Sequence, residues 1–111
     1  MSGAELIVAR IAPGDGPERV AELFGASDAT DLPKVLGVRS RSLYRYQDLY
    51  FHLVQFDGDP REALELARSR PDFHELSREL SAYVTPYDPR TWRSPADALA
   101  SEFYRWDRDG R

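Results

Sequence analysis

The stretch Arg39–Phe56, "RSRSLYRYQDLYFHLVQF", decides the fold of this 111-residue chain. Aromatic and aliphatic residues alternate with polar ones on either side of the dipeptide Gln47–Asp48, a pattern typical of two strands joined by a tight turn. The turn sets three cross-strand pairs, which are Arg45 with Tyr50, Leu43 with His52, and Arg41 with Val54. An antiparallel hairpin is therefore the predicted centre of the fold.

The two faces of this hairpin differ, because side chains alternate between the faces of a strand with period two. One face carries Arg39, Arg41, Leu43, Arg45, Tyr50, His52, Val54 and Phe56. The other carries Ser40, Ser42, Tyr44, Tyr46, Leu49, Phe51, Leu53 and Gln55. The grouping depends on the turn, since a slip of one residue changes which face each strand presents.

The segment before the hairpin predicts a strand, a helix and a loop. Residues 5–11, "ELIVARI", read as a strand that Pro13 ends. A helix follows, with Pro17 at its first position and Gly25 as its stop, because the apolar residues between them repeat at a helical spacing. Residues 26–37 are expected to form a loop.

The segment after the hairpin predicts two helical pieces and a short strand. Asp59 is placed to cap a helix that breaks at Pro71, and a second piece runs from 73 to about 80. "AYVTPY", residues 82–87, can form the last strand. The order strand, helix, strand, strand, helix, strand predicts an α+β, ferredoxin-like split βαβ fold of the dimeric α/β-barrel type, as a single domain over residues 1–111.

The uncovered face of such a sheet predicts a homodimer. A small sheet with helices on one face leaves an apolar surface of roughly several hundred Å², the size that marks an interface. The tail over residues 88–106 contains two Trp, one Tyr and one Phe, so we expect it to pack against other parts of the protein rather than to be disordered.

Composition excludes several classes of function. The net charge of −4 and pI of about 5.1 argue against nucleic-acid binding, which rests on clustered basic residues. The sequence has no Cys and no apolar window long enough to span a bilayer, so we expect neither disulfides nor a membrane anchor. Its N-terminus lacks the pattern of a secretory leader, and the cytoplasm is the expected compartment.

Arg41 and His52 are the candidate functional pair, because they are expected close together in the middle of the sheet. Two positive groups in apolar surroundings are costly unless an anion or carboxylate joins them, or unless the histidine is neutral. The pair suggests a pocket for an electron-rich ligand. The alternative is a structural pair, with His52 satisfied in the core and Arg41 reaching solvent from an edge.

Other kinds of site are not favoured by the sequence. His74, the second histidine, has no paired ligand at a metal-binding spacing, so no metal is expected. The chain lacks a serine-nucleophile elbow and a phosphate-binding glycine loop. Its aromatic residues predict core and dimer contacts, although some of them could line a pocket for a flat ligand.

Three segments together resemble a known family: "LPKVLGVRSRSLYRYQDLYFHL" (32–53), "ARSRPDFHEL" (67–76) and "YVTPYDPRTWRSPADALASEFYRW" (83–106). They are similar to the small aromatic polyketide cyclases of the tetracenomycin F2 cyclase type, found in bacterial type II polyketide pathways. The resemblance covers nearly the whole chain. It implies a ferredoxin-like protomer that dimerises through its sheet, a pocket between sheet and helices, and no cofactor or metal.

The resemblance also implies an activity and its residues. The activity is intramolecular aldol condensation and dehydration of a poly-β-ketone or a partly cyclised aromatic intermediate, with type II synthase components as possible partners. By this resemblance Arg41 binds the carbonyl or enolate oxygen, His52 moves the proton, and Asp28 orients one of them or a substrate hydroxyl. Relatives often carry His-Asp where this chain has Ser27-Asp28. The expected substrate contacts, on the face of Arg41, are Leu43, Tyr50 and Val54.

Two alternative functions stay open on the sequence alone. A cofactor-free monooxygenase of the same fold would oxidise a similar phenolic intermediate in the same kind of apolar cavity. A non-catalytic subunit would instead steer the nascent chain within a synthase complex. Oxygen consumption distinguishes the first alternative from a cyclase, and the rate of ring closure distinguishes the second.

Overall fold

A four-stranded antiparallel sheet forms the frame of the computed structural model, which describes residues 3–93 and 95–110. The strands are β1 (Gly3–Ile11), β2 (Val38–Tyr46), β3 (Leu49–Phe56) and β4 (Val84–Thr85), in the spatial order β2-β3-β1-β4. This order, with helices between β1 and β2 and between β3 and β4, is that of the ferredoxin-like split βαβ fold. The predicted α+β fold class is confirmed.

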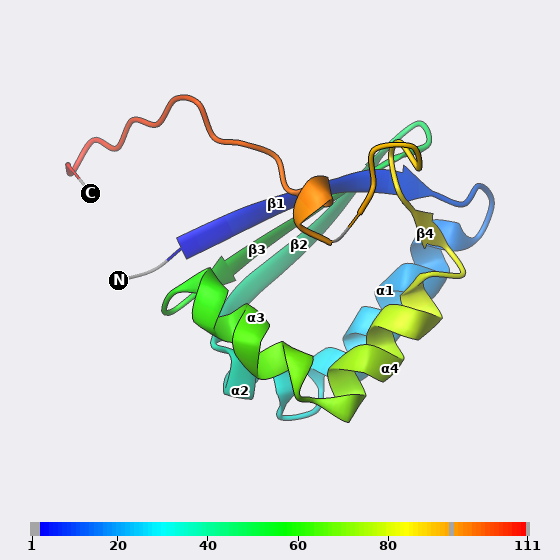
Figure 1. Cartoon of the computed structure of the whole chain (residues 1–111), viewed down its shortest axis with the longest axis horizontal. Helices are drawn as coiled ribbons and strands as arrows, with labels where there is room; N and C mark the ends of the chain where they lie inside the picture. The colour runs from blue at the N-terminus through cyan, green and yellow to red at the C-terminus, as the bar shows by residue number, and fades with distance from the viewer. Residues whose placement is uncertain (1–2, 94, 111) are drawn as a thin grey trace.

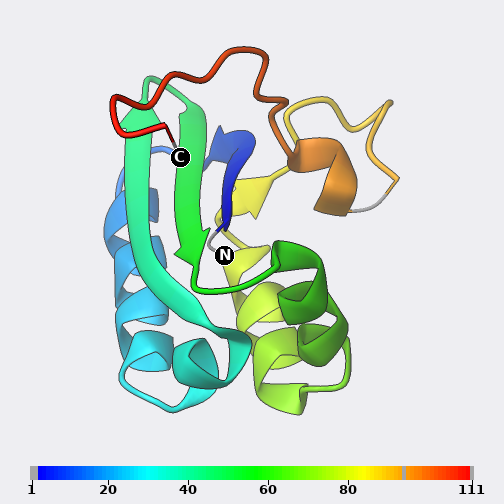
Figure 2. The same ribbon diagram turned by 90° about the vertical axis from the view of Figure 1, so that its left-hand side faces the viewer.

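The four α-helices cover one face of the sheet (Figure 1). They are α1 (Gly16–Asp28), α2 (Leu32–Leu36), α3 (Pro60–Arg68) and α4 (Pro71–Leu80). In Figure 2, α1 and α2 lie toward β2, and α3 and α4 lie on the other side. The 3₁₀ helix η1 (Pro95–Ala98) lies beside β1, at the edge of the sheet away from β2 (Figure 2), and the next residue, Leu99, forms a bridge with Ile7. Among the described residues, no helix is long and apolar enough to span a bilayer.

The hairpin has the predicted register over most of its length. Gln47, with a φ of 54°, forms the turn with Asp48, and all three predicted pairs are present. A bulge near the start of β2 changes one detail, because Val38 rather than Arg39 is opposite Phe56. The alternation groups Arg39 with the face of Arg41, near the strand end where a solvated side chain is expected, and Arg39 is indeed exposed, as the extra residue of the bulge.

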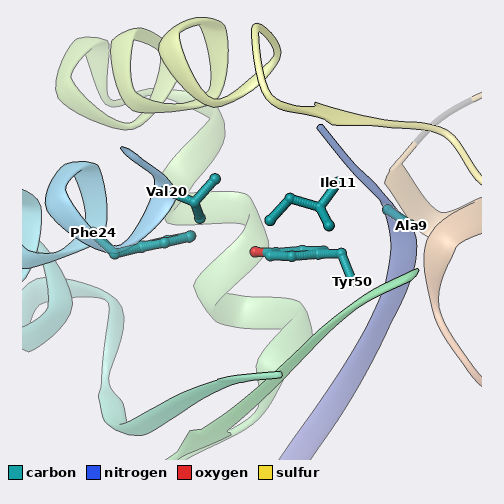
Figure 3. Packing of buried hydrophobic residues seen from close by; sticks show 5 residues of the cluster. All are labelled: Ala9, Ile11, Val20, Phe24 and Tyr50. Carbon is teal, nitrogen blue, oxygen red and sulfur yellow. The ribbon is translucent and has the colours of Figure 1, made fainter. Parts of the chain in front are cut away.

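The core under the sheet consists of two separate clusters. The first, shown in Figure 3, contains Ala9, Ile11, Val20, Phe24 and Tyr50. The second contains Val54, Phe56 and Ala63. Between them, on the same inner face, Ile7 of β1 is opposite His52 of β3. His52 is 7% exposed and Ile7 is half-buried, so the middle of the sheet carries the imidazole between two apolar regions.

Several predicted boundaries are wrong by a few residues. The first helix continues through Gly25 to Asp28, because Val20 and Phe24 pack one turn apart and their burial outweighs the low helix propensity of glycine. The expected loop contains α2, which ends at Gly37 with a φ of 74°. Asp59 caps α3 as predicted, accepting a hydrogen bond from the Arg61 N–H at 2.9 Å.

The C-terminal part differs more from expectation. Helix α4 begins at Pro71 rather than at residue 73, and β4 has only two residues. After η1, the Ala100 N–H donates to the Leu6 carbonyl at 2.8 Å, and residues 101–110 then extend past the body of the protein (Figures 1 and 2). The side chain of Phe103 is 97% exposed. The expectation that this aromatic tail packs is therefore confirmed around Ala98, which is buried, and wrong within a single chain for residues 101–106.

Candidate active site

Arg41 is held by two charge-assisted hydrogen bonds to the last residue of α1. Its Nε donates to Asp28 Oδ2 at 3.0 Å and its Nη2 donates to Asp28 Oδ1 at 2.9 Å. The Arg41 side chain is only 15% exposed, whereas that of Asp28 is 37% exposed, so the bidentate pair joins a largely buried guanidinium to a carboxylate that reaches solvent. Because α1 runs through Gly25 to residue 28, the helix delivers the carboxylate to the middle of β2.

The third contact of Arg41 joins it to His52. Arg41 Nη1 lies 3.0 Å from His52 Nε2. Since a guanidinium is only a donor, Nε2 accepts this hydrogen bond and the imidazole proton is on Nδ1. The structure therefore brings together all three predicted catalytic residues, in the order Asp28, Arg41, His52.

Phe24 completes this group and was missed by the sequence reasoning. The Arg41 guanidinium carbon lies 4.5 Å from the centre of the Phe24 ring, and the ring centres of Phe24 and His52 are 5.1 Å apart. The spacing of Phe24 and Asp28, four residues apart on one helix, could have indicated that both reach the same place. Phe24 fixes the plane of the guanidinium through a cation–π contact.

Burial and charge together keep His52 neutral. Desolvation first, and the positive charge of Arg41 second, lower the pKa of His52 from 6.5 to about 4, although Asp28 opposes the shift. The costly pairing of two cations is thus avoided in both ways, since a carboxylate neutralises the arginine and the histidine is uncharged. His52 is a buried, satisfied histidine, but Arg41 does not simply reach solvent.

The expected substrate contacts occupy different surroundings. Tyr50 and Val54 are each 4% exposed and belong to the first and second core cluster respectively. Burial raises the pKa of Tyr50 to about 12, with Arg41 opposing the shift. Leu43 is half-buried and packs against the first cluster. Tyr50 and Val54 are therefore primarily core residues that border the strip containing His52.

The two hollows that the structure describes lie elsewhere. A surface hollow of about 480 Å³ lies between α1 and α4, where Leu23 and Tyr83 line it. A hollow of about 50 Å³ lies between Val8 and the segment around Trp92. Neither is lined by Arg41 or His52. The pocket expected beside this pair therefore stays a prediction.

No group of three or more histidine, aspartate or glutamate side chains placed to hold a metal ion occurs within residues 3–93 and 95–110. The sequence-based expectation of a metal-free protein stays a prediction. The chemistry available at the site is that of a fixed guanidinium and a neutral imidazole, which can stabilise a developing oxyanion and accept a proton.

Comparison with known proteins identifies the family. Polyketide synthesis cyclases match residues 3–107. Polyketide synthase CurG of Streptomyces cyaneus is 44% identical over 94% of this chain and 96% of its own length. Tetracenomycin F2 cyclase of Streptomyces glaucescens is 42% identical over 96% of this chain and 95% of its own.

Solved structures agree with the sequence comparison. The structure of the S. glaucescens enzyme, described as a type II polyketide cyclase, covers 95% of this chain with a TM-score of 0.85, and 97% of that chain is matched. A putative antibiotic biosynthesis monooxygenase from Chloroflexus aurantiacus, 14% identical, shares the fold with a TM-score of 0.57 over 79% of this chain and 86% of its own. The sequence and fold place this chain in an enzyme family: it belongs to the polyketide synthesis cyclases.

Proposed function

We propose that this protein closes an aromatic ring by intramolecular aldol condensation and dehydration of a poly-β-ketone or a partly cyclised aromatic intermediate. The observation that carries the proposal is the chain of contacts Asp28–Arg41–His52 on the inner face of the sheet. The proposed setting is the cytoplasm, with type II synthase components supplying the substrate. Membership of a cyclase family supports this reaction class.

Arg41 is the proposed oxyanion-stabilising residue. Three of its five N–H groups are used by Asp28 and His52, which leaves one N–H on each of Nη1 and Nη2. A β-diketone carries two oxygens a few ångströms apart, and negative charge spreads over both when the carbon between them loses a proton. A guanidinium held in one orientation stabilises this charge without having to reorganise during the reaction.

Asp28 is a positioning residue in this scheme. Both of its carboxylate oxygens bond to Arg41, so the expected contact to a substrate hydroxyl is not needed to explain its place. Ser27, where relatives often carry a histidine, uses its carbonyl oxygen to accept hydrogen bonds from Thr30. Orientation of the guanidinium is therefore assigned to Asp28, together with the Phe24 ring, and not to Ser27.

His52 is the proposed proton acceptor. A neutral imidazole is unprotonated at working pH, as a base must be, because its pKa is lowered to about 4. Its Nε2 lone pair becomes available when a substrate oxygen takes over the Arg41 N–H that now bonds to it. Binding of the substrate oxygen and freeing of the base are thereby coupled.

The test is the conversion of a free poly-β-ketone intermediate by the purified protein, followed by mass spectrometry. Loss of water is the expected change, at a rate above that of the uncatalysed reaction. Arg41→Met should lower the rate by about 100-fold, the usual effect of removing an oxyanion donor. Arg39→Met is the matched control, because Arg39 lies on the same strand but is exposed in the bulge.

Other outcomes would overturn the proposal. Consumption of oxygen with a gain of mass would indicate the monooxygenase alternative. A wild-type rate equal to the uncatalysed rate would indicate the non-catalytic subunit. Equal rates for Arg41→Met, His52→Ala and wild type would remove the Arg41–His52 pair from the mechanism.

A further inference from the structure

Glu5 of β1 faces the same interior as the candidate site. The register of the sheet places Glu5 opposite Val54 of β3, and Val54 opposite Arg41 of β2. Directly opposed residues of an antiparallel sheet point to the same face. Glu5, Val54 and Arg41 therefore form one row on the inner face, in which the backbones of Glu5 and Arg41 are two strand spacings, roughly 10 Å, apart.

On that face, Glu5 lies next to the residues that separate the two core clusters. Its neighbour on the same face, Ile7, is opposite His52 and is only half-buried. Helix α3 packs against β1, and its buried residues are two alanines, Ala63 and Ala67. The buried residues of α3 thus place no polar group over this part of the inner face.

The Glu5 carboxyl is half-buried, and none of the hydrogen bonds or ion pairs among residues 3–93 and 95–110 involves it. A carboxylate removed from water is ordinarily paired with a cation or with hydrogen-bond donors. The ionisable groups that the register places on its face of the sheet are Arg41, the exposed Arg45, Tyr50 and His52, which is neutral, and the buried residues of α3 carry no charge. Glu5 is thus a titratable group that the fold does not use.

We propose that Glu5 is a second proton-transfer residue of the candidate site, facing the bound intermediate from β1 across from Arg41 and His52. The inference rests on the proposed function and deepens it. His52 takes the proton from carbon, whereas the dehydration step also needs an acid to protonate the departing hydroxyl. Glu5 is placed to supply that proton.

The proton balance of the dehydration closes with these two residues. His52 Nε2 takes the proton from the carbon next to the carbonyl, and the released electron pair forms the new carbon–carbon double bond. The neighbouring carbon–oxygen bond breaks, and the hydroxyl leaves as water with the proton of the Glu5 carboxylic acid. A proton then returns from the imidazolium to the Glu5 carboxylate through solvent, which restores both residues.

The environments of the two groups favour this direction of return. Burial raises the pKa of Glu5 above 4.5, whereas the pKa of His52 is lowered to about 4. Both shifts favour the uncharged form of each group, so they favour transfer of the proton from the imidazolium to the Glu5 carboxylate. Pairs of groups whose pKa values are moved apart in this way are typical of acid and base partners in active sites.

The test separates the two chemical steps. Glu5→Gln removes the acid but keeps the size of the side chain, and we expect dehydration to slow by about 100-fold. The aldol adduct that has closed its ring but not lost water, and is therefore heavier than the final product by one water, should then accumulate. In the wild-type protein, activity should fall with rising pH as Glu5 ionises. This fall should be absent from the pH–rate profile of Glu5→Gln. Glu62→Gln is the control, because Glu62 is an exposed carboxyl on α3.

A structural role for Glu5 makes a different prediction. If the carboxylate stabilised the fold, Glu5→Gln would lower the urea midpoint of unfolding, whereas removal of an unpaired half-buried charge should leave it unchanged or raise it. A product ratio and pH profile like those of wild type would overturn the proposal. Failure of wild type to form any ring product would instead overturn the proposed function, and the Glu5 assignment with it.

Discussion

Arg41 is the residue that connects every part of the candidate site, since Asp28, His52 and Phe24 all contact its guanidinium. The sequence predicted that Arg41 and His52 would be neighbours, because the turn at Gln47–Asp48 fixes the register of the strands that carry them. It did not show from spacing alone that Asp28 would bind Arg41. That contact depends on α1 continuing through Gly25.

Asp28→Asn should reveal how much the orientation of Arg41 contributes. Asparagine can accept only one of the two hydrogen bonds from the guanidinium, so we expect the cyclisation rate to fall about tenfold, with the substrate affinity less affected. Asp57→Asn is a suitable control, as Asp57 is exposed and lies just after β3. Steady-state kinetics would contradict the assignment if only KM changed.

The neutral state of His52 predicts a pH dependence of stability. Its pKa is about 4 in the folded protein and 6.5 when unfolded, so the unfolded chain binds the extra proton first as the pH falls. The free energy of unfolding should therefore decrease as the pH falls from about 6.5 to about 4. Below pH 4, His52 should cause no further loss of stability. The full effect is at most roughly 3 kcal/mol.

Urea unfolding at pH 7, 5.5 and 4 measures this effect. His52→Asn should lose less stability than wild type over the same interval, because asparagine does not titrate. Parallel decreases in the two proteins would show that His52 is not kept neutral by the fold. The comparison cancels contributions from the carboxylates that both proteins share.

Among the elements, the hairpin was predictable and the ends of the helices were not. Register in the hairpin follows from its turn, and only the bulge at Arg39 departs from a regular ladder. Helix ends depend on tertiary packing: Gly25 is a weak helix residue, yet Phe24 before it is buried against the sheet. Glu5 was overlooked because "ELIVARI" reads as one apolar strand, although its alternation already placed Glu5 on the face of Ile7 and Ala9.

Gly25→Ala should stabilise helix α1. Gly25 has ordinary helical backbone geometry, and a methyl group added there would meet no atom within 4 Å. We expect the free energy of unfolding to rise by about 0.5–1 kcal/mol, since alanine loses less backbone entropy in a helix. Urea unfolding curves measure this, and a lower midpoint would mean that the helix is not continuous at this residue.

At the scale of the whole molecule, the sheet face opposite the helices is the proposed dimer interface. Leu6, Phe51 and Leu53 are only half-buried on it, and Tyr44 is 56% exposed. This face and the extended aromatic tail leave apolar surface that a second copy of the chain would cover. In a dimer paired through the sheets, the tail of one protomer would pack against the surface of the other, a contact that is missing within a single chain.

Leu53→Asp should convert the dimer to a monomer, because the interface would then have to bury an unpaired carboxylate. Light scattering after size-exclusion chromatography gives the mass directly. Leu64→Asp is the matched control, since Leu64 is 43% exposed on α3, away from this face. Monomeric wild-type protein at micromolar concentration would contradict the proposed interface.

The division of the core into two clusters has a practical consequence for finding the natural substrate. A flat compound bound over Ile7 and His52 would join the two apolar regions into one continuous interior, and it would bind the folded state but not the unfolded one. Such a compound stabilises the folded state, and raises the melting temperature, with the logarithm of the ratio of its concentration to its dissociation constant. Screening a set of polycyclic phenols by thermal shift would therefore rank candidate ligands before any reaction is assayed.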